Sequence, residues 1–139
     1  MTTLRIGNDS SALVLDAAGP TDQLLARLEL DGLRAERLVR EHVSGGFDDL
    51  ADFFASLDRD WQGWSGVRTW SSLESELEIR AGHDGHVQLD VVLRQFGTLQ
   101  QYGPEPWTAT AHLTLEAGEQ LSKVAMACRQ LADKAAGRR

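Results

Sequence analysis

The clearest pattern in the sequence is an alternation of apolar and polar residues in its second half. From Leu73 to Ala81 the odd positions are mostly apolar and the even positions are charged. The alternation recurs from Val87 to Leu93 and from Trp107 to Leu115. Because successive side chains of a strand point to opposite faces, each segment is predicted to be a strand with one buried and one solvated face. Three such strands in succession favour an antiparallel meander.

His83-Asp84-Gly85 is predicted to form the turn between the first two of these strands. An odd number of loop residues keeps odd positions opposite odd positions, and glycine suits the positive φ that such a turn requires. The resulting register pairs Gly82 with His86, Leu77 with Val91, Ile79 with Leu89, Glu74 with Arg94 and Glu78 with Asp90. The last pair places two carboxylates side by side and is the one unfavourable contact of the hairpin.

Two amphipathic helices are predicted from apolar residues that recur every three or four positions. The first runs from Leu50 to Trp61, follows a group of aspartates that suits the positive end of a helix dipole, and ends by Gly63. The second begins after Gly118 and runs towards Gly137. Its apolar stripe consists of Leu121, Val124, Cys128, Leu131 and Ala135.

The first 45 residues fit more than one structure. Leu13–Leu15 is predicted to be a short buried strand. Residues 24–43 fit either a hairpin that turns at Asp31-Gly32 or one helix, since Leu, Ala, Arg and Glu are good helix formers. The hairpin is favoured because Asp-Gly is costly inside a helix and ordinary at a turn.

These elements predict an α+β fold with the order strands, helix, three-strand meander, helix. The expected architecture is a two-layer sandwich in which two helices cover a mainly antiparallel sheet. With 139 residues the chain is expected to form a single domain, residues 1–139, with its own core.

The net charge of −7, from 21 acidic and 14 basic side chains, narrows the classes of partner that the protein can bind. It argues against nucleic acid, which needs clustered Lys and Arg, and favours a basic protein if charge selects the partner. The longest apolar run, Val124–Cys128, is too short to span a membrane, and the N-terminus lacks the pattern of a secretory signal. With one cysteine, no paired-cysteine motif and no cofactor fingerprint, we expect a cytoplasmic protein without metal or cofactor.

The tryptophans near the middle of the chain are the least ordinary feature. Trp61, Trp64 and Trp70 fall within ten residues, together with Arg68, in a Gly-containing stretch between a helix and a strand. Tryptophan and arginine are enriched at binding hot spots, and an arginine can stack on an indole ring. The stretch either closes one end of the core or lines a binding groove.

The solvated face of the predicted meander carries a second group of candidates, Glu76, Glu78, Asp90 and His112. A carboxylate beside an imidazole serves acid–base chemistry or holds a cation, provided that the third strand brings His112 next to Asp90. The alternative is an ordinary solvated strand face.

Several short motifs resemble those of an uncharacterised family of small bacterial proteins of actinobacterial type. They are Trp-x-Gly-Trp-x-Gly-x-Arg-x-Trp at Trp61–Trp70, Ser72-Leu73-Glu74, the His-Asp-Gly turn, and the Leu113–Leu121 entry to the last helix. The resemblance covers residues 47–135 and implies the same order of elements. It implies no activity.

Three functions therefore compete. The first is a non-enzymatic protein-interaction domain, immunity-like, with an acidic surface. The second is a small-molecule binder or enzyme that uses the Trp61–Trp70 stretch and the Glu78, Asp90 and His112 face. The third is a homodimer that pairs exposed sheet edges.

Overall fold

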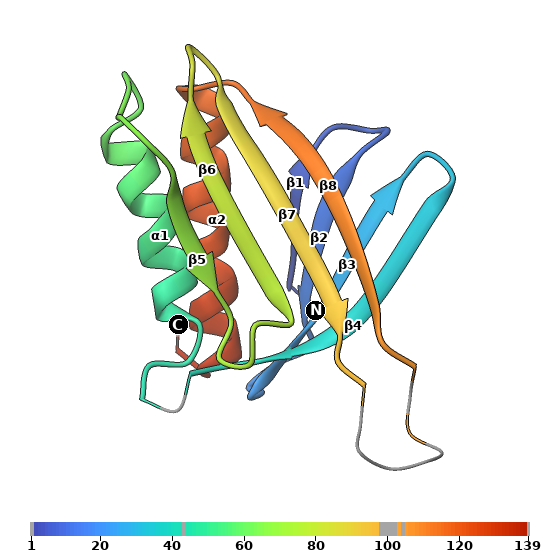
Figure 1. Cartoon of the computed structure of the whole chain (residues 1–139). Helices are drawn as coiled ribbons and strands as arrows, with labels where there is room; N and C mark the ends of the chain where they lie inside the picture. The colour runs from blue at the N-terminus through green and yellow to red at the C-terminus, as the bar shows by residue number, and fades with distance from the viewer. Residues whose placement is uncertain (1, 43, 98–102, 104, 139) are drawn as a thin grey trace.

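The computed structural model describes residues 2–42, 44–97, 103 and 105–138, and contains eight strands and two helices (Figure 1). The first half comprises β1 (Thr2–Gly7), β2 (Ala12–Ala17), β3 (Gln23–Leu30), β4 (Leu33–Arg40) and α1 (Asp48–Arg59). The second half comprises β5 (Arg68–Ser71), β6 (Leu77–His83), β7 (Val87–Gln95), β8 (Trp107–Leu115) and α2 (Glu119–Ala135).

The strands form two antiparallel four-stranded sheets rather than the one sheet predicted from the sequence. The first sheet has the order β1-β2-β3-β4 and the second the order β5-β6-β7-β8. Each strand pairs with its neighbour along the chain, and α1 separates the two sets of four. Buried residues of both sheets and both helices nevertheless belong to one core cluster.

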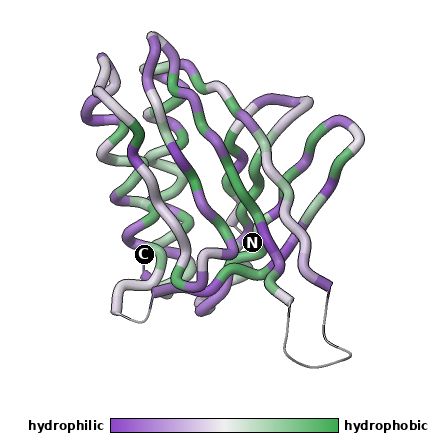
Figure 2. The backbone as a smooth tube through the Cα atoms, viewed as in Figure 1, coloured by the Kyte–Doolittle hydropathy of each residue, from purple (hydrophilic) through white to green (hydrophobic). Residues whose placement is uncertain are grey.

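The helices lie side by side along one side of the molecule, with α2 also against β1 (Figure 1). The apolar stripe predicted for α2 is confirmed, since all five of its residues are buried. Figure 2 shows hydrophobic and hydrophilic residues alternating along β6 and the first part of β7, as the period of two requires, before the apolar run Val91–Leu93. Burial raises the pKa of the Cys128 thiol to about 12, so this side chain acts as a small apolar core residue.

The favoured hairpin over residues 24–43 is confirmed as β3 and β4. They turn at Asp31-Gly32, where Gly32 has a φ of +80°, a value that glycine adopts without strain. The strand predicted at Leu13–Leu15 is the centre of β2. Strand β1 was not predicted, although its Leu4 and Ile6 are buried.

The predicted register of the β6–β7 hairpin is wrong by two residues. The loop is Asp84-Gly85-His86, so His83 pairs with Val87 and Arg80 with Asp90. The loop closes there because the Asp84 N–H donates to the His86 carbonyl at 3.1 Å, while the Asp84 carboxylate accepts the His86 N–H at 3.2 Å. The unfavourable pair of carboxylates predicted from the sequence therefore does not form.

The first strand of the predicted meander is shorter than expected. β6 begins at Leu77 rather than at Leu73, and residues 72–76 turn the chain back from β5. Ser75 has a φ of +60° in this turn, so the alternation of side chains does not continue through it. The strands predicted at Val87–Leu93 and Trp107–Leu115 are confirmed within β7 and as β8.

Candidate functional site

Trp70 belongs to the core rather than to an open groove. It lies on β5 with 6% of its surface exposed. Its indole N–H donates a hydrogen bond to Asp49 Oδ2 of α1 at 2.9 Å. The side chain thus joins the second sheet to the start of the helix.

Trp64 and Arg68 are bound to each other and to neighbouring elements. The Arg68 guanidinium lies 4.9 Å from the centre of the Trp64 ring, which confirms that the arginine stacks on an indole. Arg68 also donates to the Ser56 carbonyl at 3.2 Å and to Asp60 Oδ2 at 2.8 Å, both at the end of α1. Trp64 is half-buried, and its N–H points to the Ala81 carbonyl at 3.4 Å.

Trp61 alone of the three keeps a largely exposed ring, at 46%. Its carbonyl accepts a hydrogen bond from His83 Nε2 at 2.8 Å, while His83 Nδ1 accepts the Gly85 N–H at 3.2 Å. The side chains of Trp64, Arg68 and Trp70 therefore mainly fasten α1 to the second sheet.

Glu76 was predicted on the solvated face and is instead buried, with 1% exposure. Its carboxylate accepts hydrogen bonds from Ser72 Oγ at 2.6 Å and from the Arg40 N–H at 3.3 Å. An Arg37 nitrogen lies 4.0 Å away. Since Arg37 and Arg40 are on β4, the Glu76 carboxylate connects the two sheets.

Glu78 does lie on the solvated face but is not part of an acidic strip. Arg80 and Arg94 approach its carboxylate to 3.4 Å and 3.7 Å. These contacts neutralise the charge that the sequence pattern left unbalanced.

Asp90 and His112 face each other across β7 and β8. His112 Nδ1 is 2.8 Å from Asp90 Oδ1, and Nε2 is 2.7 Å from Gln88 Oε1. The Gln88 amide nitrogen donates to Asp84 at 3.2 Å, which directs the amide oxygen towards His112 and the Thr114 hydroxyl. Both ring nitrogens of His112 therefore have oxygen partners within the protein.

A shallow cavity of about 480 Å³ lies on the same face of the second sheet. Its lining consists of Val67, Thr69, Glu78, Arg80, Gly82, Gln88 and Asp90. The structure therefore brings two of the predicted residues, Glu78 and Asp90, to one cavity, without the tryptophan rings.

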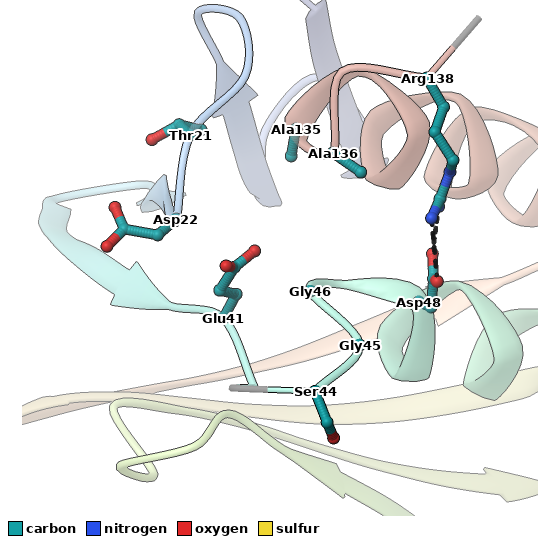
Figure 3. A pocket seen from close by; sticks show the side chains of 10 residues that line it. All are labelled: Thr21, Asp22, Glu41, Ser44, Gly45, Gly46, Asp48, Ala135, Ala136 and Arg138. Atoms are coloured by element: carbon teal, nitrogen blue, oxygen red, sulfur yellow. Dashed lines mark hydrogen bonds and ion pairs between the residues drawn. The ribbon is translucent and has the colours of Figure 1, made fainter.

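A larger cavity, of about 620 Å³, lies at the C-terminal end of α2 (Figure 3). We call it the α2-end cavity; its lining consists of Thr21, Asp22, Glu41, Ser44, Gly45, Gly46, Asp48, Ala135, Ala136 and Arg138. Figure 3 shows Glu41 pointing into it from the end of β4, with Asp22 at its edge. No local sequence pattern indicates this cavity, because only the fold brings together residues so far apart in the chain.

Asp48 and Arg138 form the charged pair of the α2-end cavity. Hydrogen bonding from Arg138 holds the pKa of Asp48 below its usual value of 3.8, and the same contact raises the pKa of Arg138. Arg129 adds a second guanidinium, 3.4 Å from the Asp48 carboxylate. The carboxyl group of Asp48 therefore stays ionised.

We expect this pair to make stability depend on pH in the acid range. The folded-state pKa of Asp48 is lowered, so its contribution is present above the unfolded pKa and is lost as pH falls through the folded value. Urea unfolding followed by circular dichroism at about pH 5 and about pH 2.5 should show a smaller acid loss of stability for Asp48→Asn than for the wild type. An equal acid loss in both proteins would contradict this.

Residues of types that bind metals also lie at the end of β6, His83, and in the loop that follows, Asp84 and His86. His83 has partners on both ring nitrogens, and the pKa of Asp84 is lowered by hydrogen bonds from Gln88 and the His86 backbone. In the part of the chain that the structure describes, no group of three His, Cys, Asp or Glu side chains is placed to hold a metal ion. Neither α1 nor α2, the helices among the described residues, has the length and apolar character needed to cross a membrane.

Comparison with known proteins gives one match. The sequence profile described as "Family of unknown function (DUF6228)" matches residues 9–135. The chain belongs to this family. No curated protein and no solved structure matches it.

Membership of DUF6228 confirms the prediction of an uncharacterised family. The matched region extends from the turn after β1 to the last residue of α2, and so includes most of both sheets and both helices. Since the family carries no assigned activity, a function has to be argued from the side chains of this chain.

Proposed function

We propose that the protein is a non-enzymatic protein-binding domain, immunity-like, and that the α2-end cavity receives a basic side chain of its partner. The observation that carries the proposal is the charge of this cavity. Its lining includes three acidic residues, Asp22, Glu41 and Asp48, but a single basic residue, Arg138. Asp48 already binds Arg138 through two hydrogen bonds.

Asp22 and Glu41 keep their negative charges uncompensated. Among the described residues neither carboxylate takes part in an ion pair, whereas Asp48 and Asp52 of α1 pair with Arg129 or Arg138, and Asp60, just after α1, pairs with Arg68. Two carboxylates at one cavity attract a cation and steer a basic partner towards it.

The end of α2 adds to the negative potential. Ala135 and Ala136 line the cavity at the C-terminus of a 17-residue helix, where the helix dipole is negative. The Thr21 N–H donates to the Ala135 carbonyl at 2.9 Å, which fixes the turn that carries Asp22 against the helix end. The cavity volume of about 620 Å³ lies within the range of ligand sites, about 300–1,000 Å³. The negative potential favours a Lys or Arg side chain in it.

The competing function, a small-molecule binder or enzyme on the outer face of the second sheet, has weaker support. Asp90 and His112 do meet, but the Gln88 amide oxygen occupies the ring nitrogen that would serve a substrate. Glu78 is balanced by two arginines. This face therefore fits a protein-contact surface better than a proton-transfer site.

The proposal predicts site-specific binding of a basic peptide. In an NMR titration with acetyl-Lys-Arg-Lys-amide, the amide signals of Thr21, Gly45, Gly46 and Ala136 should shift together. Asp22→Asn with Glu41→Gln should weaken the binding about tenfold, because both uncompensated charges are removed.

A matched control removes the same charge elsewhere. Asp31→Asn with Glu74→Gln changes two exposed carboxylates outside the cavity, and Asn-Gly remains a good turn sequence. If this control weakens binding as much as the cavity variant, or if the shifts spread evenly over the surface, the cavity is not the site. A protein captured from native lysate should likewise bind the wild type and the control, and not the cavity variant.

A further inference from the structure

Strand β4 ends the first sheet, and most of its length is exposed. It pairs with β3 on one side only. Leu33 and Leu38 are 41% and 50% exposed. An unpaired edge strand offers a row of backbone donors and acceptors to another strand.

The backbone groups that face outward from β4 are those of its even-numbered residues. The Arg40 N–H points away from β3, since it donates to Glu76 Oε2 on the other sheet at 3.3 Å. Backbone groups alternate in direction along a strand, so the N–H groups of Arg34, Glu36 and Leu38 point the same way. Their side chains share one face of the sheet.

The sequence of this edge is complementary to itself. If two β4 strands pair in antiparallel fashion about a two-fold axis at Ala35, Arg34 of each lies opposite Glu36 of the other. The same two residues carry the outward backbone groups, so each pair also exchanges backbone hydrogen bonds. Ala35, at the axis, is small enough for the strands to approach.

Other registers are less favourable. An axis at Glu36 places two glutamates opposite each other, and an axis at Arg37 does the same with arginines. An axis at Leu38 requires the Arg40 N–H, which Glu76 occupies. The edge is thus usable from Leu33 to Leu38.

We propose that two copies of this chain associate through β4, with Arg34 of each copy paired to Glu36 of the other, to form a continuous eight-stranded sheet. A groove of about 420 Å³ is lined by residues 33–36 of β4 and by Trp107, Thr108 and Ala109 of β8. Side chains of β4 from the other copy can pack in this groove. This association does not depend on the α2-end cavity.

Sedimentation equilibrium at about 1–100 µM tests the pairing, and the wild type should approach twice the 15.3 kDa of one chain. Glu36→Arg and Arg34→Glu each place like charges opposite each other twice, so either variant alone should dimerise about tenfold more weakly or worse. An equimolar mixture of the two variants should dimerise again, because the heterodimer restores both opposite-charge pairs.

The controls separate pairing from folding. Each substitution also places a like charge opposite β3, at Arg27 or Glu29, so circular dichroism and thermal unfolding must show that both variants fold. Glu74→Arg, an equal charge change at an exposed turn of the second sheet, should leave the dimer intact. A wild-type monomer at about 100 µM, or folded variants whose mixture remains monomeric, would overturn the proposal.

Discussion

Replacing Glu76 with alanine is expected to lower the free energy of unfolding by about 3 kcal/mol. The substitution removes the acceptor of the buried Ser72 hydroxyl and of the Arg40 N–H. It also leaves Arg37, 19% exposed, without the nearest carboxylate. Removing one residue of a buried hydrogen-bonded cluster lowers stability by more than the whole cluster contributes, because the remaining polar partners stay buried without hydrogen bonds.

Urea unfolding followed by circular dichroism measures this loss. Glu76→Gln keeps an acceptor for Ser72 and should lie between alanine and the wild type. Glu74→Ala, two residues earlier at an exposed position of the same turn, should stay within about 0.5 kcal/mol of the wild type. A Glu76→Ala protein as stable as the Glu74→Ala protein would show that the carboxylate does not hold the sheets together.

Glu76 also shows where sequence patterns fail. The alternation from Leu73 to Ala81 is regular, but only its second part, from Leu77, is a strand. The hydrogen bonds that form the 72–76 turn come from Ser72 and Glu76 themselves, so side-chain chemistry overrides the period of two. A glutamate predicted to be solvated is therefore one of the most buried polar residues.

The elements that the sequence predicted well are those with long, regular periods. The stripe of α2 runs from Leu121 to Ala135 and the alternations from Val87 to Leu93 and from Trp107 to Leu115. None of the three is interrupted by a turn, as the alternation from Leu73 to Ala81 is. The hairpin register depended on one turn, and the Asp84 carboxylate moved it by one loop residue. The division into two sheets depends on long-range packing that has no local signature.

The same distinction applies to the candidate site. The contact between Asp90 and His112 requires only the register of two neighbouring strands, and the alternating pattern indicated both residues. The α2-end cavity requires the β2–β3 turn, the end of β4 and the end of α2 to meet. The sequence alone shows the acidic residues of this cavity only as part of the net charge of −7, without grouping them.

Replacing Trp70 with alanine is expected to lower the free energy of unfolding by about 3–5 kcal/mol, the cost of removing a large aromatic side chain from a core. The ring is 6% exposed, and its N–H binds Asp49 across the boundary between the second sheet and α1. Trp70→Phe keeps most of the apolar contact and loses the hydrogen bond, so it should cost about 1–2 kcal/mol.

Trp61→Ala is the matched control, since that ring is 46% exposed and its removal should cost less than about 1 kcal/mol. Chemical denaturation of the three variants decides between the two interpretations of the Trp61–Trp70 stretch. A binding groove with rings held open for a ligand predicts small and similar losses for Trp61 and Trp70. A large loss at Trp70 alone means that the stretch stabilises the junction of α1 with the second sheet, which leaves Trp61 as the one ring of the three available to a partner.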